Sequence, residues 1–291
     1  MEYIKQIEKA IIFIENNLTE IIRVEDVASI TGYSCYHFHK VFKAVLGENI
    51  GNYIRSRRLN CAAGELIYTD KRILDIALYY QFESQEAFTR AFKNVYKVSP
   101  GSYRKNRIDT IIGSKREITS GYLQHIYKGV TLKPSLCQLE DKKIIGIRFQ
   151  TTLKENKLQE AWVNFSNRVD EIKHSSSDAS KYGICEVALD FNIEQFNENS
   201  KSSHFIGVEV PSFDEIPYGM SRKTLKGGKY AVFTHRGRVD SLRMTYEYIW
   251  GTWLICSGVE IDQREDFELY NERFLGTDYE QSEIEIYIPI K

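Results

Sequence analysis

An internal repeat in the first hundred residues constrains the fold of this chain more than any other feature of the sequence. Residues 24–47 align with residues 73–93 when one residue is inserted in the turn. The matched pairs are Asp26 and Asp75, Val27 and Ile76, Ala28 and Ala77, Ser34 and Ser84, Phe38 and Phe88, Lys40 and Arg90, Phe42 and Phe92, and Lys43 and Lys93. The repeat predicts two helix-turn-helix units in one all-α domain.

The helix that follows the turn in the second copy has one apolar and one polar face. Ser84 can cap its N-terminus by accepting a hydrogen bond from a free backbone amide. Apolar residues at helical spacing are Ala87, Phe88, Ala91 and Phe92. The opposite face carries Gln85, Glu86, Thr89, Arg90 and Lys93. Such side chains can contact base edges or phosphates in a major groove, so we expect a recognition helix at 84–93.

The first copy predicts a second recognition helix at 34–43. Its outward residues are Tyr36, His39, Lys40 and Lys43, at spacing i, i+3, i+4 and i+7. His37 either packs at the domain surface or touches phosphate. His37 and His39 do not predict a metal site, because residues two apart on a helix point away from each other.

Two further helices are expected in this domain. Residues 4–18 form an amphipathic pattern, and residues 53–68 a longer connecting helix of roughly 24 Å. With the packed helix pairs, that length could place the recognition helices about one DNA turn, ~34 Å, apart. One chain could then contact two successive major grooves as a monomer. Arg55, Arg57 and Arg58 are candidates for phosphate contacts or, equally, for a solvated helix flank.

Charge is distributed unevenly along the chain. Residues 1–116 hold 18 Lys+Arg and 13 Asp+Glu, a net charge of +5, whereas the remainder has a net charge of −6. A basic N-terminal part suits a polyanion such as double-stranded DNA as a partner, although charge alone favours a solvated basic face. No apolar run approaches the ~18 residues of a membrane span, so we expect a cytoplasmic protein without a membrane partner. The five dispersed cysteines predict reduced thiols, with no metal site and no cofactor.

The periodicity of the apolar residues changes from helical to mixed after a polar linker near 107–122. This linker could contain a short strand at 111–112 or a helical turn. A strand at 143–151, a helix at 158–174 and strands at 182–189 and 205–210 are expected. The order then recurs, with a strand at 230–235, a helix at 239–256 and strands at 266–270 and 283–289. Two β-α-β-β units predict an α+β domain of two related halves that form a ligand cleft. The loop at 191–203 is expected to be flexible.

Alternation in the strand 266–270 puts Glu268 and Tyr270 on one face, opposite Phe267 and Leu269. If the first face is solvated, Glu268 is an ordinary exposed acid. If it lines the cleft, a carboxylate among aromatic rings suits cationic or polar aromatic ligands. The sequence alone leaves this choice open.

Residues 5–107 closely resemble the DNA-binding domain of the AraC/XylS family of bacterial transcription regulators. The resemblance includes both motifs, the connecting helix and the terminal signature FESQEAFTRAFKNVYKVSPGSYR. By position, it implies base contacts from Tyr36, His39, Lys40, Gln85, Glu86, Thr89 and Arg90. One departure is Gln81, where the family usually has glycine. A left-handed backbone there would cost ~1–2 kcal/mol.

Residues 123–291 resemble the GyrI-like effector-binding domain through the pattern GGKYAVFTHRGR…WLICSG…DFELYNERF…EIEIYIPI. The resemblance implies that Glu268 lies in a ligand pocket. It also nominates Tyr230, Trp162, Trp253 and Tyr270 as aromatic lining, although a core position is at least as expected for Trp253 from composition. Some stand-alone relatives use the Glu with a Tyr to hydrolyse cyclopropyl compounds.

These observations predict a sequence-specific transcription regulator with a DNA-binding domain at 1–107, a linker at 108–122 and an effector-binding domain at 123–291. The expected partners are a promoter site, an amphipathic or aromatic cationic effector such as a drug, and RNA polymerase. No enzymatic activity is expected. The alternatives are a drug-sequestering or cyclopropyl-hydrolysing protein with ancillary DNA binding, and an architectural DNA-binding protein.

Overall fold

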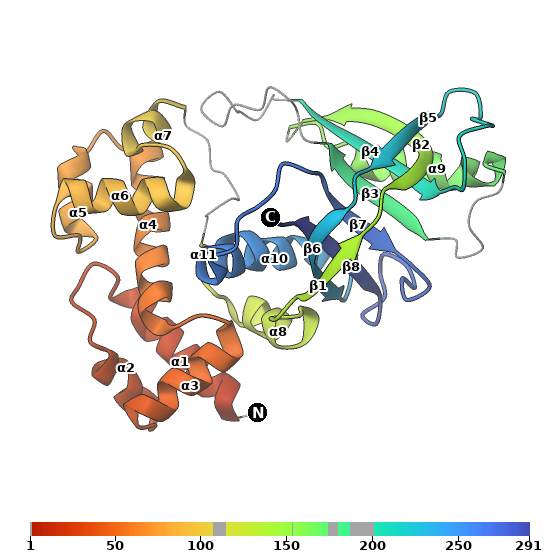
Figure 1. Cartoon of the computed structure of the whole chain (residues 1–291). Helices are drawn as coiled ribbons and strands as arrows, with labels where there is room; N and C mark the ends of the chain where they lie inside the picture. The colour runs from red at the N-terminus through yellow and green to blue at the C-terminus, as the bar shows by residue number, and fades with distance from the viewer. Residues whose placement is uncertain (1, 107–114, 153, 174–179, 187–200) are drawn as a thin grey trace. The chain divides into compact units, whose positions relative to one another are not determined.

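The chain divides into two units in a computed structural model that describes residues 2–106, 115–152, 154–173, 180–186 and 201–291 (Figure 1). The described residues up to Leu132, together with the segment Arg243–Gly258, form the first unit, and the other described residues form the second. Within the described ranges, none of the helices has the length and apolar character needed to cross a membrane.

The first unit is helical. Its N-terminal helices are α1 (Glu2–Asn16), α2 (Val24–Thr31), α3 (Cys35–Leu46), α4 (Ile50–Tyr68), α5 (Ile73–Tyr79), α6 (Gln85–Tyr96), α7 (Pro100–Asn106) and α8 (Ser120–Gly129). The long helix α4 connects the group α1–α3 to the group α5–α7 (Figure 1). The segment Arg243–Gly258 adds most of α10 (Leu242–Tyr248), a π-helical stretch η3 (Ile249–Trp253) and α11 (Leu254–Ser257).

The predicted repeat is confirmed in three dimensions. Ser34 and Ser84 cap α3 and α6, since each side chain accepts a hydrogen bond from the amide three residues on. Both helices end in a left-handed residue, Gly47 and Lys97, with φ of 77° and 62°. The apolar residues shared by the two copies are buried: Val27, Ala28, Phe38 and Phe42 in the first, and Ile76, Ala77, Phe88 and Phe92 in the second. Local capping and burial thus produce the same motif twice.

Gln81 has the left-handed backbone that the departure from glycine suggested, with φ of 62°. The equivalent turn of the first motif has Gly32, with φ of 71°. The Gln81 side chain donates a hydrogen bond of 2.6 Å from Nε2 to the Thr19 carbonyl in the α1–α2 connection. Because such a bond contributes about 1 kcal/mol, it offsets much of the backbone cost.

The second unit is built on one eight-stranded antiparallel sheet in the order β1-β6-β8-β7-β3-β4-β2-β5. The strands are β1 (Ser135–Leu139), β2 (Lys142–Thr151), β3 (Lys181–Glu186), β4 (Ser202–Glu209), β5 (Ser221–Leu225), β6 (Gly228–Arg236), β7 (Asp266–Tyr270) and β8 (Glu283–Pro289). The helical elements of this part are α9 (Leu158–Arg168) and the 3₁₀ turns η1 (Val169–Glu171) and η2 (Val239–Ser241).

The strand order confirms the prediction of two related halves. Exchanging β1–β4 with β5–β8 and reversing the order reproduces the same sheet, with its centre at the β3–β7 pair. The first strand of each half pairs with the other half, since β1 pairs with β6 and β5 with β2. The sequence patterns missed β1 and β5, which are five residues long and largely exposed or half-buried.

Two other expectations concern connections. Helix α8 spans Ser120–Gly129, where no helix was expected, and it crosses the predicted domain boundary at 122–123. Thr119 caps it, and Tyr122, Leu123 and Ile126 are buried. The alternatives at 111–112 lie outside the described residues, as does most of the loop at 191–203, whose last two residues belong to β4.

Candidate functional sites

The predicted DNA-contacting residues of the first motif share the exposed face of α3. Tyr36, which is 70% exposed, precedes His39, Lys40 and Lys43, which are exposed as well. The Lys40 ammonium lies 4.4 Å from the centre of the Tyr36 ring. This cation–π contact holds a positive charge on the face opposite Phe38 and Phe42. His37 instead packs edge-on against Tyr33, with ring centres 4.9 Å apart, which favours a surface packing role.

Helix α6 presents the corresponding face of the second motif. Gln85, Glu86, Arg90 and Lys93 are exposed, and Thr89 is half-buried. Hydrogen bonds from its own backbone amide and from the Ser84 side chain lower the pKa of Glu86. The carboxylate is therefore ionised at the positive end of the helix. An ionised acid in this position can accept a hydrogen bond from a cytosine amino group.

Of the three arginines proposed for phosphate contacts on α4, only Arg55 is exposed. Arg57 is buried and forms a two-point ion pair with Glu15, with both N–O distances at 2.8 Å. Arg58 donates to the Leu18 and Glu20 carbonyls. Arg57 and Arg58 thus hold α1 and the loop after it on α4. The phosphate hypothesis is wrong for Arg57, because its guanidinium cannot reach solvent.

In the second unit, three of the predicted ligand residues converge around Gly183. Tyr270 donates a 2.5 Å hydrogen bond to Glu268 Oε2, which confirms that the two side chains share a face. Trp162 of α9 packs edge-on against Tyr270, with ring centres 4.7 Å apart. A Cβ at Gly183 would lie 3.1 Å from Trp162 and 3.5 Å from Glu268 Oε2. We call Trp162, Gly183, Glu268 and Tyr270 the carboxylate–aromatic cluster.

Gly183 was missed by sequence reasoning, although a glycine inside a strand often marks the close approach of another group. It lies directly opposite Glu268 in the β3–β7 register. Because glycine has no side chain, Trp162 and the Glu268 carboxylate can pack closely over it. Burial is the main cause that raises the pKa of Tyr270 well above its ordinary value, and the Glu268 charge adds to this. The phenol therefore stays protonated and acts as a hydrogen-bond donor.

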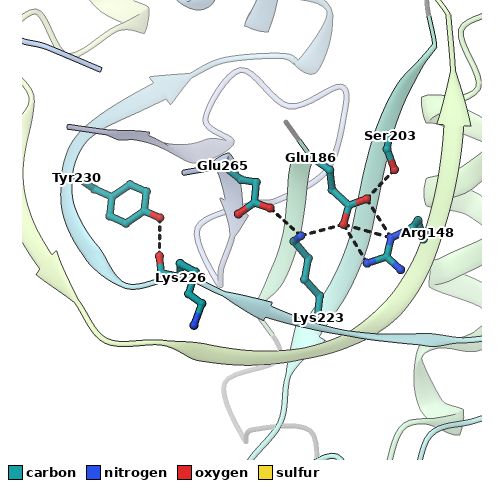
Figure 2. Close-up of polar contacts among 7 residues, drawn as sticks. All are labelled: Arg148, Glu186, Ser203, Lys223, Lys226, Tyr230 and Glu265. Atoms are coloured by element: carbon teal, nitrogen blue, oxygen red, sulfur yellow. Dashed lines mark hydrogen bonds and ion pairs between the residues drawn. The ribbon is translucent and has the colours of Figure 1, made fainter. Parts of the chain in front are cut away.

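Two predicted ligand residues do not join this cluster. Tyr230 is fully buried and packs against Phe267, with ring centres 5.4 Å apart, on the face opposite Glu268. Its hydroxyl donates to the Lys226 carbonyl (Figure 2). Sequence alternation within β6 could not reveal which sheet face its residues occupy, so the prediction for Tyr230 is corrected to a core position. Trp253 is buried in η3, which belongs to the first unit.

The Tyr230 face of the sheet also carries an ion-pair network (Figure 2). Glu186 pairs with Arg148 at 2.9 Å and with Lys223 at 2.8 Å, and Lys223 also pairs with Glu265 at 2.9 Å. Burial opposes ionisation of Glu186, but hydrogen bonds from Arg148, Lys223 and Ser203 outweigh it and lower its pKa to about 2. The network joins strands β2, β3, β4 and β5. The positive charges of Arg148 and Lys223 balance the negative charges of Glu186 and Glu265, so these four side chains carry no net charge that would attract an ionic ligand.

Asp266 predicts a pH dependence of stability in the second unit. Burial is the largest cause that raises its pKa to about 7, and the charges of Glu268 and Glu265 add to it. The folded chain therefore keeps a proton that the unfolded chain loses above about pH 4, and stability declines as pH rises through about 7.

We expect the free energy of unfolding of Asp266→Asn, relative to that of wild type, to increase by about 2 kcal/mol between about pH 5 and pH 8. Urea denaturation at both values measures it, and a pH-independent difference would contradict it.

Comparison with protein families shows to which family the chain belongs. Residues 132–291 match the model of the GyrI-like small molecule binding domain, which is more than half of the chain. The chain belongs to the GyrI-like family. Residues 27–106 match a helix-turn-helix domain model, which covers most of the double motif.

The relatives match this chain over different lengths. YbfP, an HTH-type transcriptional regulator of Bacillus subtilis, is 53% identical over 104 residues, which are 36% of this chain and 35% of YbfP. The transcriptional regulator Rob of Salmonella typhimurium is 28% identical over 271 residues, covering 91% of this chain and 89% of Rob. A solved bacterial transcription regulation protein from Staphylococcus aureus MU50 is 21% identical, with a TM-score of 0.43, and covers 55% of this chain and 98% of that one.

The chain therefore combines an AraC-type helix-turn-helix DNA-binding domain with a C-terminal GyrI-like ligand-binding domain. Its relatives in this group are transcriptional regulators. The structure adds which side chains are exposed on the recognition helices and which ones surround Glu268.

Proposed function

We propose that one copy of the chain recognises a promoter site by placing α3 and α6 in two successive major grooves of double-stranded DNA. The observation that carries this proposal is the pair of equally capped recognition helices with matching exposed faces. They are joined by the 19-residue helix α4, which is about 28 Å long. That length is of the order of one DNA turn, ~34 Å.

The proposed contacts divide by chemistry. Tyr36, His39 and Lys40 in α3, and Gln85, Glu86, Thr89 and Arg90 in α6, are assigned to base edges. Lys43 and Lys93, near the helix C-termini, are assigned to phosphates, as is Arg55. With the helices so placed, a second protomer is not needed to reach the adjacent groove.

Selection of DNA from a random pool on the full chain tests the groove proposal. Footprinting of the selected duplex should show two protected half-sites about 10–10.5 base pairs apart, with one protein per duplex. Binding of two protein copies per duplex, or protection of a single half-site, would overturn the monomeric two-groove model.

For the GyrI-like domain, we propose an aromatic cation as the ligand of the carboxylate–aromatic cluster. Glu268 supplies negative charge, Trp162 and Tyr270 supply ring surfaces, and Gly183 lets these three side chains lie close together. A ligand of this class regulates DNA binding or an RNA polymerase contact only if its affinity differs between two states of the protein.

Glu268→Gln should weaken binding of an aromatic cation such as rhodamine 6G by roughly 1–2 kcal/mol, because the carboxylate loses its charge while its shape is kept. Fluorescence polarisation measures this affinity on the full chain without DNA. The matched control is Glu209→Gln, on β4 of the same sheet. If wild type and Glu268→Gln bind the aromatic cation equally well, the ligand binds elsewhere. The DNA affinity of both variants should be unchanged.

A second candidate function is hydrolysis of a cyclopropyl compound, which the short Tyr270–Glu268 hydrogen bond favours. Our proposal is that the chain is a regulator and not an enzyme. Incubation of purified protein with a cyclopropyl substrate decides between them. Turnover that disappears in Glu268→Gln would establish the enzyme, whereas an unchanged substrate supports the regulator.

A further inference from the structure

The two helix-turn-helix motifs differ at the residues that follow their recognition helices. Gly47 and Glu48 follow α3, whereas Lys97 and Val98 occupy the equivalent places after α6. Apart from this difference, the motifs continue alike. Asn49 and Ser99 each cap the next helix, α4 or α7, by accepting a hydrogen bond from the amide three residues on.

Both distinctive residues of the first motif contact parts of the chain that come after the second motif. A Cβ at Gly47 would lie 2.5 Å from the Tyr248 hydroxyl, so only glycine permits this approach. Glu48 forms a 2.6 Å ion pair with Lys115, and both side chains are almost fully buried. Lys115 also donates a 2.5 Å hydrogen bond to Thr252 Oγ1. The second motif, with Lys97 and Val98, lacks this chemistry although its own fold is the same.

The contacting segment is Arg243–Gly258, which we call the docking segment. Further contacts attach it to the rest of the first unit. Tyr248 donates a 3.0 Å hydrogen bond to the Leu132 carbonyl, and His125 bonds Thr245 at 2.8 Å. Asn52 of α4 approaches Cys256, with 3.6 Å between Nδ2 and Sγ. Ile255 packs against the core of the second motif.

The docking segment nonetheless belongs to the GyrI-like match, which covers residues 132–291. The chain enters it from Leu242 and leaves it at Val259, and both residues belong to the second unit. Within it, the backbone changes from α-helix to π-helix at Ile249–Trp253, the stretch that contains Thr252. Single π-helical turns often mark functional positions.

Docking leaves the DNA-facing residues free. Tyr36, His39, Lys40 and Lys43 remain exposed with the segment in place, because the contacts are made at the C-terminal end of α3 and along α4. The docked arrangement is therefore compatible with DNA binding. It also restrains the end of α3 relative to α4, which reduces the entropy lost when both recognition helices bind together.

We infer that the docking segment holds the first recognition helix in its DNA-binding position, and that the GyrI-like domain acts on DNA through this segment and the first motif. The inference rests on the proposed two-groove function. By linkage, a change that releases the segment weakens DNA binding, and DNA binding favours docking by the same factor.

Cross-linking reports docking directly. Asn52→Cys places a thiol beside the native Cys256, and a mild oxidant should join the two in the full chain, whereas wild type gives no such product. Gly47→Lys copies the second motif and should push Tyr248 away. Its matched control is Lys97→Gly. Thr252→Val, which removes only the hydroxyl partner of Lys115, serves as a second and milder releasing variant.

In the Asn52→Cys background, we expect Gly47→Lys to slow cross-linking by about 5- to 100-fold. The affinity for the selected duplex should fall by a similar factor, and protection should be lost at one half-site. Thr252→Val should lower the cross-linking rate and the DNA affinity as well, whereas Lys97→Gly should change neither. Cross-linked Asn52→Cys protein should keep wild-type affinity. If both releasing variants cross-link as fast as the Asn52→Cys protein alone, or if cross-linking slows while DNA affinity is unchanged, the inference is overturned. Failure of wild type to protect two half-sites would instead refute the two-groove function, while cross-linking and total affinity still decide the docking role.

Discussion

Lys40→Ala and Arg90→Ala should each weaken binding to the selected duplex by about 1–3 kcal/mol and relax base preference in one half-site only. Each side chain lies on the exposed face of a different recognition helix, so each substitution removes contacts in a different groove. Lys40 and Arg90 are matched positions in the repeat. The double variant should lose roughly the sum, ~2–6 kcal/mol, because distant sites contribute independently.

The measurement is affinity against a panel of duplexes in which each half-site is altered in turn, at a fixed salt concentration. Arg55→Ala is the control for a phosphate contact. It should weaken all duplexes alike and reduce the slope of log affinity against log salt by about 1. If Lys40→Ala and Arg90→Ala change preference in the same half-site, the two helices do not occupy separate grooves.

The helical domain could be predicted from sequence because its determinants are local. Ser34 and Ser84 cap their helices, and Phe38 and Phe88 recur at helical spacing, so nearby residues define each element. The left-handed backbone of Gln81 was indicated in another way, by the glycine that the resembled family usually has at this position. Arg57 was mispredicted because its partner, Glu15, is 42 residues away, and sequence does not show which arginine of a helix turns inward.

In the GyrI-like domain, the alternation of side chains predicted which residues of one strand share a face, but not which residues of different strands do. It correctly placed Glu268 and Tyr270 together, because β7 is short and regular. It could not relate β6 to β7, so it could not test Tyr230, which the resemblance had nominated as pocket lining. It also gave no weight to Gly183 on β3. The docking segment was predicted as an ordinary helix, since its partners Gly47 and Lys115 are separated from it by more than a hundred residues of sequence.

Arg57→Met should lower the free energy of unfolding of the helical unit by about 3–5 kcal/mol, the largest stability effect that we expect from one substitution in this chain. Arg57 makes a two-point ion pair with Glu15, and it also donates to the Lys115 carbonyl at 2.5 Å and to Asn60. The pKa of Arg57 is raised: burial acts against its charge, but hydrogen bonding and charge pairing with Glu15 prevail. Removing it leaves the Glu15 carboxylate buried with Tyr53 as its remaining side-chain donor among the described contacts.

A second variant separates the lost charge pair from lost packing. Arg57→Met combined with Glu15→Gln buries no unpaired charge, so it should recover about 1–2 kcal/mol relative to Arg57→Met alone. Urea denaturation of the full chain, followed by far-ultraviolet circular dichroism, reports the helical unit, and Arg55→Met on the exposed side of α4 is the matched control. Equal losses from Arg57→Met and Arg55→Met would show that Arg57 is not the link between α1 and α4. Because the same guanidinium binds the Lys115 carbonyl, Arg57→Met should also slow cross-linking between Asn52→Cys and Cys256, which joins the stability of the first motif to docking.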